Sequence, residues 1–182
     1  MGECRCRPGV GGLKCDHCVA TFWGIHLIAK GALGCRPCGC SVFGSSRLDC
    51  EQSTGRCQCK KGSFGLKCDT CNADSIITAI GCVKKDEYKA PKSCSETQCH
   101  HGAKCVMDRS GMPDCKCPVD KCPFENIGSV VNMTVCASNG VTYDNFCELN
   151  QFACTHQLDL VAVSLGFCNN GQIRECFLLL NS

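Results

Sequence analysis

The sequence predicts a chain of several small modules, each stabilised by disulfide bonds rather than by one large apolar core. Cysteine accounts for 24 of the 182 residues, about 13%, which exceeds the roughly 8–10% typical of a disulfide scaffold. Only 6% of the residues are aromatic and 19 are glycine, so a single core of ordinary size is not expected. The cysteines follow two spacing patterns separated by a cysteine-free segment, which indicates more than one kind of small disulfide-rich module.

Thiols at this density stay paired only in an oxidising compartment, unless a metal ion binds them. The chain is therefore either secreted and disulfide-bonded, or intracellular and zinc-bound. A net charge of +2 gives no general attraction to nucleic acid or to an anionic membrane. No apolar run is long enough to span a membrane, and the N-terminus lacks the apolar stretch of a signal peptide. We interpret the chain as a fragment with Met1 as an internal start.

An internal repeat relates the first two modules. Shifted by 53 residues, CRCRPGVGGLKCDHC at 4–18 aligns with CQCKKGSFGLKCDTC at 57–71, with every cysteine in register. The second copy has eight cysteines between 38 and 82, spaced C-x-C-x9-C-x6-C-x-C-x8-C-x2-C-x10-C, and the first copy has only the last five. We expect a truncated first module at 1–37 and a whole second module at 38–82.

The eight-cysteine order resembles the laminin-type EGF-like module, a family with short β-hairpins and little other regular structure. The resemblance implies disulfides that join Cys6 with Cys15, Cys18 with Cys35, Cys38 with Cys50, Cys40 with Cys57, Cys59 with Cys68, and Cys71 with Cys82, and leaves Cys4 without a partner. ATFWG after Cys18 is similar to the paired aromatic residues of this family, whose rings can cover a disulfide. ADSIITAIG after Cys71 departs from the pattern and predicts an altered last loop.

A charged segment without cysteine, VKKDEYKAPK, predicts a linker at 83–93. The next ten cysteines are spaced differently: 94–117 looks like the EGF-like hairpin of a follistatin-like module, and 117–168 resembles a Kazal domain. We call these the hairpin unit and the Kazal-like unit. The resemblance implies disulfides that join Cys94 with Cys105, Cys99 with Cys115, Cys117 with Cys154, Cys122 with Cys147, and Cys136 with Cys168. Residues 169–182, including Cys176, match no module.

Local sequence supports an α+β fold of three short strands and one helix for the Kazal-like unit. SNG at 138–140 predicts a hairpin turn, because Asn-Gly tolerates positive φ, and VTY provides the returning strand. Asp144 or Asn145 can cap a short helix that places Cys147 and Cys154 on one face. LDLVAVSLGFC then predicts the third strand.

Zinc binding is the main alternative for the CxxC pairs, since Cys15-x2-Cys18-x16-Cys35-x2-Cys38 fits the spacing of zinc ribbons. The repeat argues against zinc, because the second copy has only a lone Cys82 after its CxxC. A thioredoxin-type redox site would need a CxxC at the start of a helix after a strand. We therefore predict disulfides, no metal site and no cofactor. His100 and His101 show no ligand spacing and are interpreted as surface residues.

The Kazal-like unit raises protease inhibition as an alternative function. The position two residues after the second cysteine of this unit is Phe124, which the resemblance implies would enter a chymotrypsin-like primary pocket. Thirteen residues separate Cys122 from Cys136, where inhibitory members usually have about seven, and a long loop is poorly preorganised. The same loop holds the sole N-x-[ST] motif, at Asn132, and a glycan there would obstruct a protease.

Heparin-like polysaccharide is a candidate partner because four lysines gather in and beside the linker, at positions 84, 85, 89 and 92, with Lys60 and Lys61 nearby in sequence. Asp86 and Glu87 interrupt this cluster, which favours a solvated linker. Ser110-Gly111 is a possible glycosaminoglycan attachment dipeptide, but it is typical of a hairpin turn.

The order of modules over residues 4–168 resembles that in agrin, a family of basement-membrane heparan sulfate proteoglycans. The resemblance implies a secreted matrix protein in which this region is a rod-like structural spacer without enzymatic activity. It also implies contacts with other matrix or cell-surface proteins. Binding to nucleic acid and insertion into a membrane are not expected.

Overall fold

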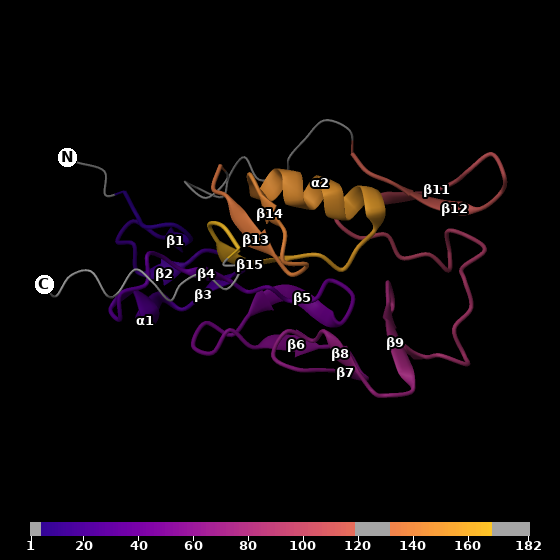
Figure 1. Cartoon of the computed structure of the whole chain (residues 1–182), viewed down its shortest axis with the longest axis horizontal. Coiled ribbons are helices and arrows are strands. Elements are labelled where there is room, and N and C mark those ends of the chain that lie inside the picture. The colour runs from indigo at the N-terminus through magenta and orange to yellow at the C-terminus, as the bar shows by residue number, and fades with distance from the viewer. Residues whose placement is uncertain (1–4, 119–131, 169–182) are drawn as a thin grey trace, which may run out of the picture.

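The computed structural model describes residues 5–118 and 132–168 (Figure 1). Short antiparallel strand pairs and disulfide bonds make up most of the fold, with one longer helix in the Kazal-like unit. The predicted fold class is confirmed. In the described part of the chain, no helix is long and apolar enough to cross a membrane.

The first module is built from two short strand pairs and one helical turn. Its elements are β1 (Val10–Gly11), β2 (His17–Cys18), β3 (Phe22–Trp23), α1 (Ile25–Ile28) and β4 (Arg36–Pro37). β1 pairs with β2, and β3 pairs with β4. Gly24 precedes α1 with a φ of 87°, a left-handed conformation that glycine adopts without strain.

The second module repeats this plan and changes its last loop. Its elements are β5 (Ser45–Cys50), β6 (Cys57–Cys59), β7 (Ser63–Phe64), β8 (Thr70–Cys71), β9 (Ser75–Thr78) and β10 (Gly81–Lys84). The β7–β8 pair lies 53 residues after β1–β2, in the register of the sequence repeat. The β9–β10 hairpin replaces β3, α1 and β4, and its second strand extends to Lys84, two residues into the predicted linker.

A hairpin and then a small sheet with a helix complete the chain. The elements are β11 (Lys104–Met107), β12 (Pro113–Lys116), β13 (Val135–Ala137), β14 (Thr142–Tyr143), α2 (Phe146–His156) and β15 (Ala162–Leu165). The sheet has the strand order β14-β13-β15. Of the two candidate caps, Asn145 is the N-cap of α2, because its side chain accepts a hydrogen bond from the Glu148 backbone N–H at 2.9 Å.

The buried side chains differ in kind between the units. An ordinary apolar core lies between α2 and the sheet of the Kazal-like unit, made of Val135, Ala137, Tyr143, Leu149, Ala153, Leu160 and Ala162. In the second module the buried cluster consists of cysteines at positions 38, 40, 50, 57 and 68. Disulfides therefore take the place of an apolar core in this module.

The Kazal-like unit lies against the first and second modules (Figure 1). Its strand β15 lies beside β4 of the first module. This folded-back arrangement differs from the extended row expected of a rod-like spacer, because side chains far apart in the sequence hold the units together.

Candidate functional site

Ten disulfides are described, and they join Cys6 with Cys15, Cys18 with Cys35, Cys38 with Cys50, Cys40 with Cys57, Cys59 with Cys68, Cys71 with Cys82, Cys94 with Cys105, Cys99 with Cys115, Cys117 with Cys154, and Cys136 with Cys168. Their Cα–Cα distances of 4.8–6.0 Å are normal for disulfides. Cys147 is also disulfide-bonded. Its expected partner Cys122, together with Cys4 and Cys176, lies outside the described residues.

In each CxxC motif the two cysteines belong to different disulfides. Cys15 and its repeat equivalent Cys68 have positive φ angles of 52° and 61°, an uncommon conformation for a residue with a side chain. The backbone therefore turns sharply at the first cysteine of the two repeated motifs, 15–18 and 68–71, where the two sulfur atoms enter different loops. Within residues 5–118 and 132–168, no three potential metal ligands lie together.

The junction of the first two modules is formed around Trp23. This ring packs against the cysteine cluster of the second module and lies so close to Gly55 that a Cβ atom there would be 2.3 Å from Trp23 Cε2. Gln52 donates a hydrogen bond from Nε2 to the Phe22 carbonyl at 2.8 Å. Phe22, which is 2% exposed, packs with Cys18 and Cys35 as the aromatic pattern predicts.

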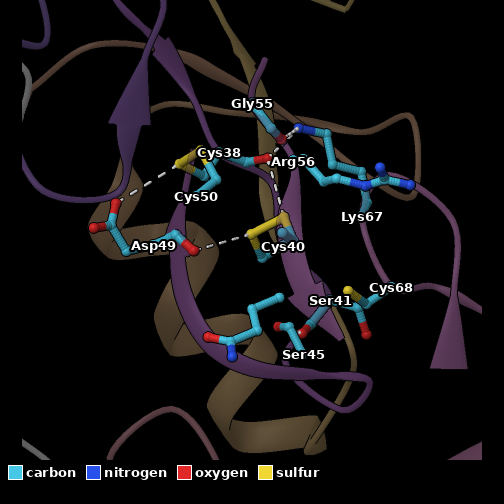
Figure 2. Close-up of a disulfide and its surroundings, with 12 residues drawn as sticks. Cys38, Cys40, Ser41, Ser45, Asp49, Cys50, Gly55, Arg56, Lys67 and Cys68 are labelled. Carbon is cyan, nitrogen blue, oxygen red and sulfur yellow. Dashed lines mark hydrogen bonds between the residues drawn. A yellow bond between two sulfur atoms is a disulfide. The ribbon is translucent and has the colours of Figure 1, made fainter. Parts of the chain in front are cut away.

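Lys67 binds this junction from the second module (Figure 2). Its ammonium group donates hydrogen bonds to the carbonyl oxygens of Cys38 and Gly55 and lies 5.7 Å from the centroid of the Trp23 ring, within the range of a cation–π contact. Burial lowers the pKa of Lys67, and nearby Asp69 opposes this shift. Lys67 lies in the repeated GLKC stretch, but no sequence pattern indicates this role.

A carboxylate of the Kazal-like unit binds the loop that follows Cys40. One oxygen of Asp159 accepts a hydrogen bond from the Ser41 hydroxyl at 2.6 Å, and the other accepts hydrogen bonds from the backbone N–H groups of Val42 and Phe43 at 2.7 and 3.4 Å. We call Ser41–Phe43 the carboxylate loop. These contacts join residues 116–118 positions apart in sequence, so sequence reasoning did not find them.

Two histidines of the hairpin unit lie beside this contact, and they are partly buried where the sequence predicts surface residues. The His100 ring Nε2 lies 2.6 Å from the Ala79 carbonyl oxygen, and the His101 ring Nε2 lies 2.7 Å from the Leu158 carbonyl oxygen. Both rings are half-buried. Burial lowers the pKa of His101, while its hydrogen bond to Leu158 opposes that shift. His101 also has a φ of 56°, as the predicted turn requires.

Aromatic rings also contact one another in the interface between the units. The rings of Phe22 and Phe146 lie 5.9 Å apart, and those of Phe43 and His100 lie 5.0 Å apart. A pocket of about 120 Å³ remains between the units, with Phe22 and Phe146 in its lining. The face is therefore part apolar and part polar, as is usual for an interface between domains.

The remaining candidate residues are dispersed. Phe124 lies outside the described residues. Asn132 is exposed in a turn, and the Ser110 hydroxyl donates to Asp108 within the hairpin turn at 2.6 Å. Among the predicted lysine cluster, several amines have protein partners: Lys60 binds the carbonyl of Phe43, Lys84 binds Glu87, and Lys85 binds the carbonyl of Ala73.

Comparison with known protein families identifies two kinds of domain. The laminin EGF domain matches residues 1–35 and 38–99, and the Kazal-type serine protease inhibitor domain matches residues 113–171. A Kazal-type domain therefore follows the laminin EGF domains.

Similar proteins include usherin and laminins. Usherin of Homo sapiens is 44% identical over 70 residues, which cover 38% of this chain and 1% of usherin. Laminin subunit alpha-1 of Mus musculus is 41% identical over 82 residues, covering 45% of this chain and 3% of that subunit. Laminin subunit beta-1 of Drosophila melanogaster is 40% identical over 102 residues, covering 56% of this chain and 5% of that subunit. This chain spans a few per cent of these relatives. Because the laminin EGF domain matches more than half of its residues, the chain belongs to the laminin EGF domain family.

Proposed function

We propose that this chain is a secreted extracellular-matrix protein with a structural and protein-binding role, and that it forms a spacer region of an agrin-like basement-membrane proteoglycan. The order of modules carries this proposal: the laminin EGF match ends at residue 99 and the Kazal-type match begins at residue 113, with the β11–β12 hairpin between the second module and the Kazal-like unit. Disulfides throughout the described residues support an oxidising compartment. The folded-back arrangement makes the proposed spacer compact rather than rod-like.

The compartment is tested by secreting the chain from cultured cells and measuring its intact mass before and after reduction. The proposed pairing has eleven bridges, including Cys122 with Cys147, and each bridge adds about two mass units on reduction. The deposited matrix and the medium are then probed for the protein. Retention inside the cell with free thiols and bound zinc would contradict the proposal, as would secretion without any deposition in the matrix.

The proposed partners are other matrix or cell-surface proteins and heparin-like polysaccharide. Lys89 and Lys92 are exposed and lie in the lining of a cavity of about 770 Å³ beside the β9–β10 hairpin, together with Lys84. Glu87 and Glu96 line the same cavity, which limits its positive charge. If these amines bind sulfated chains, changing the three lysines to glutamine lowers the salt concentration that elutes the protein from heparin, whereas Lys104→Gln with Lys116→Gln does not.

Protease inhibition is the second candidate, because residues 113–171 match a Kazal-type serine protease inhibitor domain. The expected contact is Phe124. An unglycosylated protein would then inhibit a chymotrypsin-like protease saturably, and Phe124→Gly would abolish the inhibition while Phe64→Gly, at an exposed position in the second module, would not. Absence of inhibition by the unglycosylated protein would eliminate this function.

A further inference from the structure

The linker connects the laminin EGF modules to the hairpin unit, and no described disulfide runs parallel to it. Of the ten described disulfides, six lie at or before Cys82 and four lie at or after Cys94. When the backbone is cut inside a disulfide loop, the two ends stay covalently joined. A cut in the linker leaves no described disulfide between its two sides.

The middle of the linker is open to water. Every residue from Lys84 to Ala90 is exposed. The preceding strand ends at Lys84, and two backbone hydrogen bonds of the turn that follows end on the carbonyl of this residue. Residues 88–92 form no regular structure, and Pro91 favours an extended backbone at Ala90. Exposed segments of this kind are preferred sites of proteolysis.

Lys89 differs from the other lysines of the linker in its contacts. Within the described part of the chain, neither Lys89 nor Ala90 makes a hydrogen bond or an ion pair. The others are engaged: Lys84 forms an ion pair, Lys85 donates to two carbonyl oxygens of the second module, and the Lys92 N–H donates to a glutamate carboxylate. Both the side chain of Lys89 and the peptide bond after it are therefore accessible.

Two other basic residues of the described chain lie between consecutive disulfide loops, and both are in strands. Arg36 lies in β4, where it pairs with Trp23 and is followed by Pro37. Lys116 lies in β12, where it pairs with Lys104. A protease reaches a paired strand only after the strand has opened locally. The linker is therefore the point at which cutting after a basic residue most readily separates the chain.

The packed interface between the units does not depend on the linker. The buried cluster around Phe22 packs against Met133, Phe146 and Leu165 of the Kazal-like unit, and β15 lies beside β4. Asp159 accepts three hydrogen bonds from the carboxylate loop. None of these contacts involves a linker residue, so all of them remain after the linker is cut.

We propose that the Lys89–Ala90 peptide bond is a processing site for a trypsin-class serine protease, and that the cleaved protein persists as two chains held together by the packed interface. Proteases of this class carry a carboxylate in their primary pocket, which the unpaired ammonium group of Lys89 fits. Hydrolysis breaks the C–N bond with one water molecule. The hydroxyl goes to the Lys89 carbonyl carbon, which becomes a carboxylate, and the proton goes to the Ala90 nitrogen, which becomes a new N-terminus.

Limited digestion of the full, disulfide-bonded chain with trypsin tests the site. In denaturant without reductant, a cut after Lys89 releases the pieces 1–89 and 90–182, whereas a cut inside a disulfide loop only adds the mass of one water. Lys89→Gln slows this release by about tenfold or more, because the protease pocket loses its ionic partner. Lys85→Gln, an exposed lysine of the same linker, is the matched control and does not slow it. First cleavage at Arg109 or at any other residue would overturn the site.

Native mass spectrometry of the cut protein tests the two-chain form. We expect one complex with the mass of both pieces, which denaturant separates without reductant, and a single chain under both conditions for the uncut control. Separation of the pieces in native buffer would overturn the two-chain form. Pieces that stay joined in denaturant would also overturn it, since they would reveal a covalent bridge across the linker.

Matrix-producing cells that secrete the chain test the processing itself. The piece that begins at Ala90 accumulates in the medium or matrix, and an inhibitor of trypsin-class proteases prevents its formation. Absence of this piece from the secreted protein would overturn the processing. Only this experiment rests on the proposed secretion, so a failure of secretion is distinguished from a failure of the site by the digestion of the purified chain.

Discussion

Replacement of Gly55 by alanine tests how the first two modules are joined. Gly55 has a φ of 70°, and a Cβ atom at this position would lie 2.3 Å from Trp23 Cε2 and 2.7 Å from Cδ2 and Cζ2. The ring cannot move away easily, because it packs against the cysteine cluster and the Lys67 ammonium group. The added methyl group therefore separates the modules or displaces the tryptophan.

The expected loss of stability has two parts. A side chain in the left-handed region costs about 1–2 kcal/mol, and an added carbon in a well-packed site costs about 1–3 kcal/mol. Gly55→Ala should thus destabilise the junction by about 2–5 kcal/mol. Gly31→Ala is the matched control in the first module: Gly31 has a φ of 99° and no atom within 4 Å of an added Cβ, so only the backbone cost applies.

The assay uses the fluorescence of Trp23, the only tryptophan in the chain. Guanidinium unfolding followed at its emission gives the stability of the junction. We expect a lower midpoint and a red-shifted emission of the folded Gly55→Ala protein, and a native emission for Gly31→Ala. If Gly55→Ala loses no more stability than Gly31→Ala and keeps the native emission, Trp23 does not join the modules as described.

Three further outcomes are expected. Lys67→Met should destabilise the second module by about 1–3 kcal/mol, since two carbonyl oxygens lose their donor, and chemical unfolding should show no such loss for the exposed Lys30→Met. Acidification below pH 6.5, the ordinary pKa of histidine, should weaken the contact between the units. Burial lowers the pKa of His101 beside His100 and Asp159 while the contact is formed. An exposed His101 therefore takes up a proton at a higher pH than a buried one, and protonation favours the form in which the contact is broken. The protection factor of the Val42 amide, which corrects for the base-catalysed intrinsic exchange rate, should fall as the pH falls, less steeply in His101→Gln, and a flat profile would contradict this prediction. Asn132 should carry a glycan after secretion, detected as a mass difference that Asn132→Gln removes; equal masses would show the site to be unused.

The cysteine spacing, through its resemblance to known modules, was sufficient to predict the fold class, because the disulfides of the first two modules and of the hairpin unit join cysteines only 9–17 residues apart. The 53-residue repeat reappears as the equivalent pairs β1–β2 and β7–β8. In the Kazal-like unit, Ser138–Gly140 forms the predicted turn between β13 and β14. Local patterns thus determined the hairpins, the helix and its approximate start.

The sequence could not choose between Asp144 and Asn145 as the cap of α2, since both residue types accept the same hydrogen bond. It also did not reveal the partners of His100 and His101, because a residue with no ligand spacing looks like a surface residue until its neighbours are known. Their partners, Ala79 and Leu158, are 21 and 57 residues away. No local pattern encodes contacts at such separations.

By itself, the sequence determined a set of small disulfide-rich modules and the order in which they occur. The tertiary structure alone decided that these modules fold back on one another, with Asp159 bound to the carboxylate loop and Trp23 against Gly55. The physical reason lies in the range of the interactions. Disulfide loops, turns and caps depend on residues a short distance apart, whereas contact between modules depends on surface shape and on hydrogen bonds that form only after each module has folded.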